Sequence, residues 1–381
     1  MLFLHLKTKD TSIMKYSEEF YRLAIQHQEG YGPASIKKML QLAGSATAIF
    51  EKPDSWRGAL RSHKKSVPPP SVSSALRRTV DEELKKMDKA GIRLCFYSAP
   101  DFPYRLKMCP DGPLSFFYLG NGEFNRAHIL AIVGTRNASE YGRQCVQKIL
   151  GELKGTDVVT VSGLAYGIDT EAHWQSIGNQ LRTLAVMGSG LGVIYPYANK
   201  DLARRIIDHG GTLISEYPYD TQPDRLNFPK RNRIIAGMSD ATLVAESGEK
   251  GGSIITAYLA HSYNRDVFAV PGQIQDPMHC GCHLLIQKNV AALVTSGEDI
   301  LEMMNWKKNV ASGVQTQLFV ELSEPEQSIV DLLRGQDAVS IDKIAEHFPN
   351  HTPSYLAGLL LGLELKNVIT CKPGKSYSIK P

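Results

Sequence analysis

Seven short apolar runs that alternate with helical patterns constrain the fold of this 381-residue chain more than any other feature. Runs of this kind are typical of buried strands, and a helix between consecutive strands favours a parallel sheet with helices on both faces. In such α/β sheets, ligands bind beyond the carboxyl ends of the strands. The runs are HILAIVG (128–134), DVVTVSG (157–163), RTLAVMG (182–188), GTLISE (211–216), ATLVAE (241–246), DVFAVPG (266–272) and AALVTSG (291–297).

Different patterns flank this region. Residues 16–51 indicate short helices around a Gly30-Tyr31-Gly32 turn. This is typical either of a helix-hairpin-helix, whose turn amides touch phosphate, or of a plain helical hairpin, and both interpretations stay open. Residues 61–78, rich in Pro, Ser and basic residues, predict a linker.

After about residue 320, three helical patterns and two strands, NVITCK and SYSIK, predict a winged helix. Residues 322–381 hold six Lys and Arg against seven Asp and Glu, and the third helical pattern offers no cation before Lys366. A helix that reads the major groove normally presents Arg, Asn or Gln. The composition therefore favours protein docking or packing over base reading.

Charge and apolar content limit the possible partners. The net charge of +4 is too small to identify one, so a nucleic-acid footprint would have to be local. No apolar run has the length of a membrane span, and LFLHL at the N-terminus is too short for a signal peptide. We therefore expect a cytoplasmic protein with reduced cysteines. The amphipathic pattern starts near Met14, which leaves residues 1–13 as a disordered lead or a start-site artefact.

Three patterns that resemble cofactor or catalytic sites are incomplete. HCGCH (279–283) lacks the second ligand pair of a zinc site, so a tight turn at Gly281 is preferred to a metal. GSGLGVIYP (188–196) departs from the dinucleotide fingerprint, and no nicotinamide cofactor is expected. For Asp169 and His173, one helical turn apart, a helix N-cap and a packed histidine are preferred to a catalytic pair.

Motifs suited to anions follow three of the predicted strands. The first strand ends in Gly-Thr-Arg, the second in a shelf of small residues, SGLA, and the fifth is followed by Gly-Gly-Ser at a helix start. Glycine lets backbone amides approach a phosphate, Thr and Arg donate to its oxygens, and a helix N-terminus favours an anion. The residues concerned are Gly134, Thr135, Arg136, Ser162, Gly163, Gly252 and Ser253.

A cluster of cations stands where another helix is expected to begin, in NFPKRNRIIAG (227–237). Pro229 suits the first helical position. Because a helix N-terminus carries partial positive charge, cations there are unfavourable unless an anion binds. We expect Lys230 and Arg233 to face a phosphate backbone, and we assign no role to Arg231.

No Ser-His-Asp arrangement, carboxylate pair or Walker lysine accompanies these motifs. Several anion-binding motifs without a catalytic group are better suited to binding a polyanion than to converting a metabolite. Phe228, beside the cations, is either a stacking face for an unpaired base or a core aromatic.

Five of these motifs, in order, closely resemble the DNA-processing protein A family, DprA/Smf. They are AIVGTR, VSGLAYGIDTEAH, DRLNFPKRNRIIAG, GGSIITA and VFAVPG. The resemblance is strong over about 92–300, and the flanking segments agree with the family's three-part layout. It implies a helix-hairpin-helix or SAM-like domain with a linker (14–78), an extended Rossmann domain that binds single-stranded DNA (85–305) and a winged helix (320–381).

The resemblance implies a single-stranded DNA-binding protein of natural transformation and recombination, not an enzyme. Such a protein protects incoming DNA, helps to load RecA onto it and forms a homodimer. Two residues depart from the commonest family pattern: Thr135 replaces a frequent Ser but keeps the hydroxyl, and Cys280 is an extra thiol. The binding residues carried over are Gly134, Thr135, Arg136, Ser162, Gly163, Phe228, Lys230, Asn232, Arg233, Gly252 and Ser253.

The main rival function is enzymatic. A related Rossmann family of phosphoribohydrolases cleaves nucleoside monophosphates with a motif resembling PGGxGTxxE. Aligning GGSIITAY with that motif places Tyr258 where the catalytic Glu would stand, so the acid is missing. A transcription regulator that reads duplex DNA is disfavoured by the lack of cations in the third helix of the winged helix.

Overall fold

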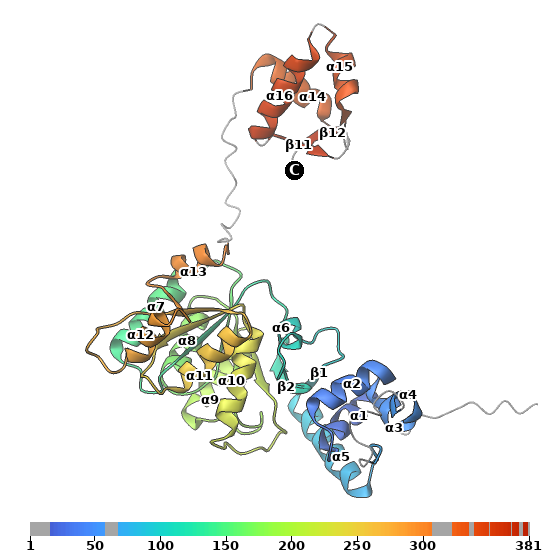
Figure 1. Ribbon diagram of the computed structural model, residues 1–381, viewed down its shortest axis with the longest axis vertical. Helices are drawn as coiled ribbons and strands as arrows, with labels where there is room; N and C mark the ends of the chain where they lie inside the picture. Colours follow the sequence, from blue (N-terminus) through green and yellow to red (C-terminus); the bar gives the residue numbers. More distant parts are fainter. Residues whose placement is uncertain are drawn as a thin grey trace, which may run out of the picture. The chain divides into compact units, whose positions relative to one another are not determined.

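The computed structural model describes residues 16–57, 68–306, 322–334, 339–349, 351–366, 368–372 and 376–379. The chain divides into two compact units, Met1–Val310 and Ala311–Pro381 (Figure 1). The predicted lead at residues 1–13 lies outside the described residues. None of the described helices is long and apolar enough to cross a lipid bilayer.

Short helices form the beginning of the first unit. They are α1 (Glu18–Ala24), the 3-10 helix η1 (Ile25–His27), α2 (Pro33–Ala43), α3 (Ala46–Glu51), α4 (Asp54–Arg57) and α5 (Ser74–Ala90). Pro33 opens α2 at a position where a missing N–H costs nothing. The predicted linker is wrong at its end, because the Ser73 hydroxyl accepts from Leu76 N and starts the 17-residue helix α5.

A nine-stranded sheet forms the centre of this unit, in the order β1-β2-β6-β5-β4-β3-β7-β8-β9. The strands from β6 to β9 in this order are parallel, which confirms the predicted α/β sheet. The sequence patterns missed β1 and β2, which pair antiparallel at one edge. The strands are β1 (Arg93–Phe96), β2 (Ser115–Gly120), β3 (Ile129–Gly134), β4 (Val159–Ser162), β5 (Thr183–Met187), β6 (Thr212–Ser215), β7 (Ala241–Glu246), β8 (Asp266–Ala269) and β9 (Ala292–Leu293).

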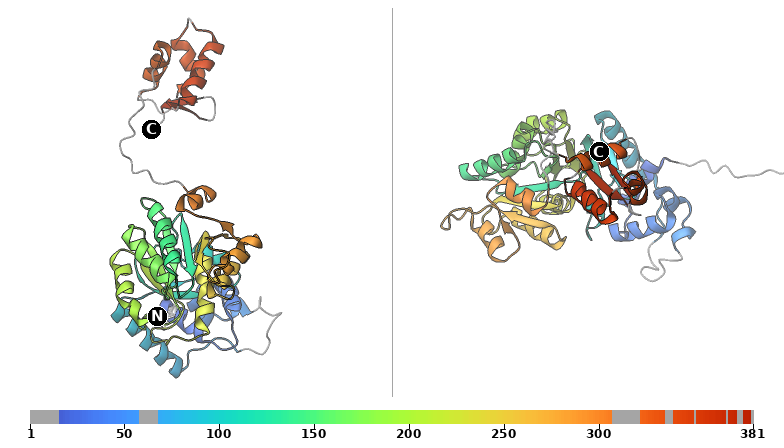
Figure 2. Two further views of the ribbon diagram at one scale, coloured as in Figure 1. Left: turned by 90° about the vertical axis from the view of Figure 1, so that its left-hand side faces the viewer. Right: turned by 90° about the horizontal axis from the view of Figure 1, so that it is seen from above.

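Helices cover both faces of the sheet because successive strand residues point to opposite sides. Ile129 and Ala131 of β3 pack in one core with α10 and α11, whereas Leu130 and Ile132 pack in another with α7 and α8. Figure 2 shows the two helix layers in green and yellow. The helices are α6 (Tyr104–Lys107), α7 (Glu140–Glu152), α8 (Ile168–Gly178), η2 (Tyr197–Asn199), α9 (Lys200–Asp208), α10 (Asn227–Met238), α11 (Gly252–Ser262), α12 (Cys280–Gln287) and α13 (Gly297–Met303).

The chain changes direction in the middle of the sheet. From β3 it proceeds through β4, β5 and β6 on one side, then crosses back to β7, β8 and β9 on the other. The loops after β3 and β7 therefore start side by side, and Thr135 N donates to Glu246 O at 2.8 Å. A crevice at such a switch point is where open α/β sheets bind ligands.

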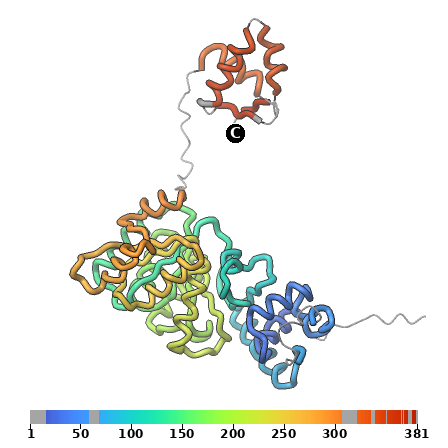
Figure 3. The backbone as a smooth tube through the Cα atoms, in the orientation of Figure 1, coloured from blue at the N-terminus to red at the C-terminus, as the bar shows by residue number. Residues whose placement is uncertain are grey.

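The second unit confirms the predicted winged helix (Figure 3). Ile329, Leu360 and Ile369 contribute to its apolar core. The short strand β10, which the sequence patterns missed, pairs with β12. The elements are α14 (Glu324–Leu333), β10 (Val339–Ser340), α15 (Ile341–His347), α16 (Pro353–Leu365), β11 (Ile369–Lys372) and β12 (Ser376–Ile379).

Candidate nucleic-acid interface

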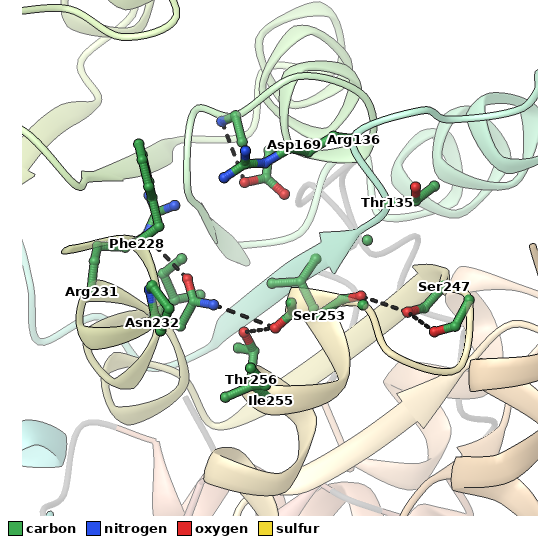
Figure 4. Close-up of a pocket in the computed structure, with 18 of the residues that line it drawn as sticks. Thr135, Arg136, Asp169, Phe228, Arg231, Asn232, Ser247, Ser253, Ile255 and Thr256 are labelled. Carbon is green, nitrogen blue, oxygen red and sulfur yellow. Dashed lines mark hydrogen bonds between the residues drawn. The ribbon is translucent and has the colours of Figure 1, made fainter. Parts of the chain in front are cut away.

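An open cavity of about 560 Å³ lies at the switch point of the sheet, and we call it the anion cavity. The loops after β3 and β7 and the starts of α10 and α11 enclose it (Figure 4). Its lining residues are Val133, Gly134, Thr135, Arg136, Ala165, Asp169, Tyr195, Arg225, Phe228, Pro229, Arg231, Asn232, Ile235, Ser247, Gly248, Gly251, Gly252, Ser253, Ile255 and Thr256.

Two helix N-termini open into the anion cavity. The N-cap residues Leu226 and Gly251 make no side-chain bond to the amides of α10 and α11, although Asp224 accepts from Leu226 N and Asn227 N just before α10. Asn232, in the second turn of α10, donates to Gly252 O at the start of α11, at 3.4 Å, which connects the two helices. Uncapped amides and the helix dipole both favour a negative ligand.

Arg231 forms the buried base of the anion cavity. Its guanidinium donates to Gly163 O at 2.5 Å and also to Val186 O. Burial lowers the pKa of Arg231 to about 10, which leaves it protonated at neutral pH. A Cβ on Gly163 would lie 2.5 Å from the guanidinium, so the glycine is needed for this approach.

Asp169 lies near this cation. Gly163 N and Ala165 N donate to its carboxylate, at 3.1 Å and 3.4 Å, so Asp169 ties down the SGLA loop. The predicted N-cap role is wrong, because α8 begins at Ile168 with Gly167 as its N-cap. Burial raises the pKa of Asp169, and the charge of Arg231 opposes this shift.

Glu246, the acidic residue at the end of β7, does not line the anion cavity. The Glu246 carboxylate accepts from the Ser139 amide at 2.8 Å and from its hydroxyl at 2.5 Å, at the start of α7. Asp169 is therefore the one carboxylate among the described residues that line the anion cavity.

His173 is fully buried and does not line the anion cavity. Its Nδ1 lies 2.7 Å from the Thr183 hydroxyl. Burial lowers the pKa of His173 to about 3, so the ring is neutral at physiological pH. This is the environment of a packed histidine.

Arg136 and Phe228 form one unit on the rim of the anion cavity. The Arg136 guanidinium carbon lies 5.1 Å from the centre of the Phe228 ring, within the range of a cation–π contact. A Cβ on Gly188 would lie 2.7 Å from this ring, so Gly188 leaves the space that Phe228 needs. The ring thus supports the guanidinium at the entrance.

The structure brings most, but not all, of the predicted binding residues into this lining. Ser162 is fully buried and donates to Ile132 O, and Gly163 lies in an adjoining hollow. Lys230 is exposed outside the lining, and Arg233 pairs with Glu216 at 2.5 Å. Seven of the eleven line the cavity: Gly134, Thr135, Arg136, Phe228, Asn232, Gly252 and Ser253.

The sequence analysis missed several lining residues. Arg225 precedes the cation cluster and could have been counted with it, since it lies only five residues before Lys230. Thr256 lies one helical turn after Gly252 and could have been found from that spacing. Nothing in the sequence signalled Ser247, Tyr195 or the buried position of Arg231.

Two local predictions, a helix start at Pro229 and a tight turn at Gly281, are corrected here. Pro229 is the third residue of α10, not the first, because the helix begins at Asn227. Gly281 lies in α12 and not in a turn; a Cβ there would lie 2.4 Å from Gly248 O, so close packing explains the glycine. The described residues contain no cluster of three or more His, Cys, Asp and Glu that could hold a metal.

Comparison with solved structures supports the fold. The X-ray structure of DNA processing protein A (DprA) from Streptococcus pneumoniae matches with a TM-score of 0.60 and 33% identity, covering 77% of this chain and 99% of that one. A structure of DNA processing protein A from Helicobacter pylori, described in terms of its single-stranded DNA binding mode, matches with a TM-score of 0.51 and 24% identity. It covers 56% of this chain and 98% of that one.

Sequence comparison gives the same result. The DNA processing protein DprA of Streptococcus pneumoniae is 42% identical over 227 residues, covering 58% of this chain and 79% of that protein. Protein Smf of Escherichia coli is 33% identical over 302 residues, covering 78% and 80%. Residues 93–305 match the family model for DNA recombination-mediator protein A, and residues 316–375 match the DprA winged helix domain. The chain therefore belongs to the DNA recombination-mediator protein A family, DprA/Smf.

Proposed function

We propose that the anion cavity binds the phosphate backbone of single-stranded DNA. The observation that carries this proposal is the convergence of two uncapped helix N-termini with the guanidinium groups of Arg136, Arg225 and Arg231 on one open cavity. Positive charge in backbone amides and arginines suits a chain of phosphates. The relative from Helicobacter pylori is described as binding single-stranded DNA, in agreement with this proposal.

The wider role that we propose follows the family. The protein acts in the cytoplasm during natural transformation and recombination, where it protects incoming single strands and helps to load RecA onto them. It works as a homodimer. Names of relatives that refer to DNA processing support the general role, and the family resemblance supports the RecA and dimer proposals.

We propose that this protein is not an enzyme. Asp169, the one carboxylate among the described lining residues, already accepts from two backbone amides. Tyr258, which aligns with the catalytic Glu of the phosphoribohydrolases, is outside the lining. Release of free base from nucleoside monophosphates by the purified protein would contradict this proposal.

We also propose that the winged helix docks a protein and does not read bases. The Lys366 ammonium is bound at 2.8 Å to Glu326 within the same unit. On α16, Leu361 and Tyr355 are exposed, which suits an apolar contact better than a groove of duplex DNA.

Substitution of Arg136 tests the proposed DNA site. Arg136→Ala should weaken binding of single-stranded oligonucleotides by about tenfold or more, equally for different sequences, because a phosphate contact is lost. The slope of log K against log salt should also become shallower by about 0.7. Fluorescence anisotropy titrations at several salt concentrations measure both quantities.

Arg204→Ala is the matched control. Arg204 is an exposed arginine on α9 that pairs with Asp201 of the same helix and lies outside the anion cavity. Its loss should leave affinity and salt slope almost unchanged. Wild-type affinity in Arg136→Ala, or an equal loss in both variants, would rule out the proposed site.

A further inference from the structure

A short loop, which we call the Arg136 loop, carries Arg136 between the end of β3 and the start of α7. It consists of residues 135–139. Arg136 and Asn137 are exposed, and Arg136 lines the anion cavity. An exposed side chain has no packed neighbours on most sides, so its direction depends on the backbone that carries it. The position of the guanidinium therefore depends on how the two ends of the Arg136 loop are held.

Glu246, at the end of β7, holds both ends of the Arg136 loop. At the first end, Thr135 N donates to the main-chain oxygen of Glu246 at 2.8 Å. At the second end, the amide and the hydroxyl of Ser139 donate to the side-chain carboxylate of Glu246, at 2.8 Å and 2.5 Å. The first end has a further main-chain bond, from Ile168 N to Thr135 O at 3.1 Å. The second end is tied to the neighbouring strand by the carboxylate.

The surroundings of the Glu246 carboxylate suit this contact with the loop. Glu246 is fully buried and does not line the anion cavity. A Cβ on Gly142 would lie 2.5 Å from Oε2, so the glycine lets the first turn of α7 approach the carboxylate, where the helix dipole favours it. His279 Nε2 lies 3.7 Å from Oε1, beyond hydrogen-bond distance. The carboxylate therefore acts on the Arg136 loop and not on a ligand in the cavity.

We propose that Glu246 is a positioning residue for Arg136, which raises the affinity of the anion cavity for phosphate without touching the ligand. The inference rests on the proposed binding of single-stranded DNA. The Phe228 ring supports the guanidinium at 5.1 Å, and the Glu246 carboxylate fixes the backbone from which this side chain extends. A group that is held in place before binding loses less conformational entropy when the ligand arrives. The held loop therefore binds phosphate more tightly than a free loop.

A double-mutant cycle with Arg136 tests this role. Glu246→Ala should weaken binding of a deoxythymidine oligonucleotide about three- to tenfold, because the loop end at Ser139 is released. In an Arg136→Ala background, the same substitution should have almost no further effect, since the positioned group is gone. A purely structural role would instead lower affinity by the same factor in both backgrounds. Fluorescence anisotropy measures the four affinities, and circular dichroism shows whether each protein is folded.

Ser139→Ala tests the same contact from the loop side, and it decides the question if loss of the buried carboxylate prevents folding. It removes the hydroxyl bond and leaves Glu246 and the Ser139 amide in place. Affinity should fall about two- to fivefold, and this loss should again vanish in the Arg136→Ala background. The hydroxyl also accepts from Gly142 N at 3.0 Å as the N-cap of α7, so a loss of stability accompanies the change.

Glu152→Ala is the matched control. The Glu152 carboxylate also holds the start of a helix, because Gly297 N of α13 donates to it at 2.6 Å, but it lies outside the anion cavity. Its loss should leave DNA affinity almost unchanged. Losses from Glu246→Ala or Ser139→Ala that persist in the Arg136→Ala background, or wild-type affinity in the folded variants, would overturn the positioning role alone. Wild-type affinity in Arg136→Ala itself would overturn the proposed DNA site as well.

Discussion

Arg231 is a buried cation whose charge is in place before any ligand arrives. Two backbone carbonyls fix its guanidinium, and the Asp169 carboxylate lies near enough to oppose the effect of burial on its pKa. The free-energy cost of removing this cation from water therefore arises when the protein folds and not when a ligand binds. A phosphate bound at the proposed site would find this cation already in place.

Gly163 leaves the space that the Arg231 guanidinium occupies, and substitution of this glycine should therefore have measurable effects. Gly163→Ala should lower the free energy of unfolding by about 1–3 kcal/mol, because the new methyl group would meet the guanidinium of Arg231 at 2.5 Å. It should also weaken single-stranded DNA binding by displacing that cation. Urea unfolding and anisotropy titrations measure the two effects.

Gly151→Ala provides the control for this substitution. Gly151 is exposed in α7, and a Cβ there would meet no atom within 4 Å. This variant should gain up to about 1 kcal/mol of stability, because alanine is the better helix former, and DNA affinity should not change. A Gly163→Ala protein as stable as wild type would contradict the packing argument.

The three cations of the NFPKRNRIIAG segment show what sequence reasoning could not resolve at this scale. Residues of an α-helix are separated by about 100° around its axis. Lys230, Arg231 and Arg233 therefore point to solvent, to the buried base of the anion cavity and to Glu216. The expected helix start at Pro229 was two residues late, so the rotation of the side chains could not be assigned. A role for Lys230 and Arg233 in binding DNA stays a prediction.

At the scale of elements, the apolar runs located the parallel strands because the central ones, β3 to β7, are buried on both faces; only β9, at the edge, is exposed among these described strands. Strands β1 and β2 escaped detection for different reasons. Arg93 is exposed and Leu94 half-buried in the edge strand β1, so it forms no buried run, whereas FFYLG in β2 is an apolar run that could have been found. The beginning of α5 escaped because it directly follows a segment rich in proline and serine.

Glu326, in the first turn of α14, accepts from the Ser323 amide and from Lys366, and these bonds lead to a pH-dependent prediction. The hydrogen bond from Lys366 holds the pKa of Glu326 below its ordinary value of 4.5. A carboxyl with a lowered folded-state pKa stabilises the fold above its unfolded-state pKa, and that contribution is lost as the pH falls through the folded-state value. Glu326→Gln should therefore destabilise the winged helix at pH 7, by about 1 kcal/mol or less, and have a smaller effect near pH 3.

Urea unfolding followed by circular dichroism at both pH values measures this difference. Glu346→Gln is the control, because Glu346 is an exposed acid on α15 of the same unit. The control should unfold as wild type at each pH. A Glu326→Gln effect of equal size at both pH values would contradict the assigned ion pair.

For the whole molecule, the division into Met1–Val310 and Ala311–Pro381 predicts where DNA acts. A ligand stabilises only the unit that binds it, by about 2.7 kcal/mol at one hundred times its dissociation constant. Single-stranded DNA should therefore raise the melting temperature of the first unit and leave the second unchanged in calorimetry of the full chain. An equal shift of both transitions would show that the winged helix takes part in binding.

The sequence predicts that the first unit itself contains two parts, a helical domain and the domain built on the sheet. Core residues of the N-terminal helices, such as Phe20 and Met39, share one cluster with Phe117 of β2 and Leu213 of β6. The three-part division expected from the sequence stays a prediction, because this apolar contact joins its first two parts. Truncation before β1 would expose that contact and is expected to destabilise the sheet.

The contacts of Arg231 also set an order of events during folding. The guanidinium joins α10 to carbonyls that follow β4 and end β5, which lie 68 and 45 residues away in the chain. These partners meet only when the central strands have paired, so the cavity cannot assemble from a local segment. A nascent or partly unfolded chain therefore lacks the assembled cavity, so the proposed DNA binding requires a complete sheet.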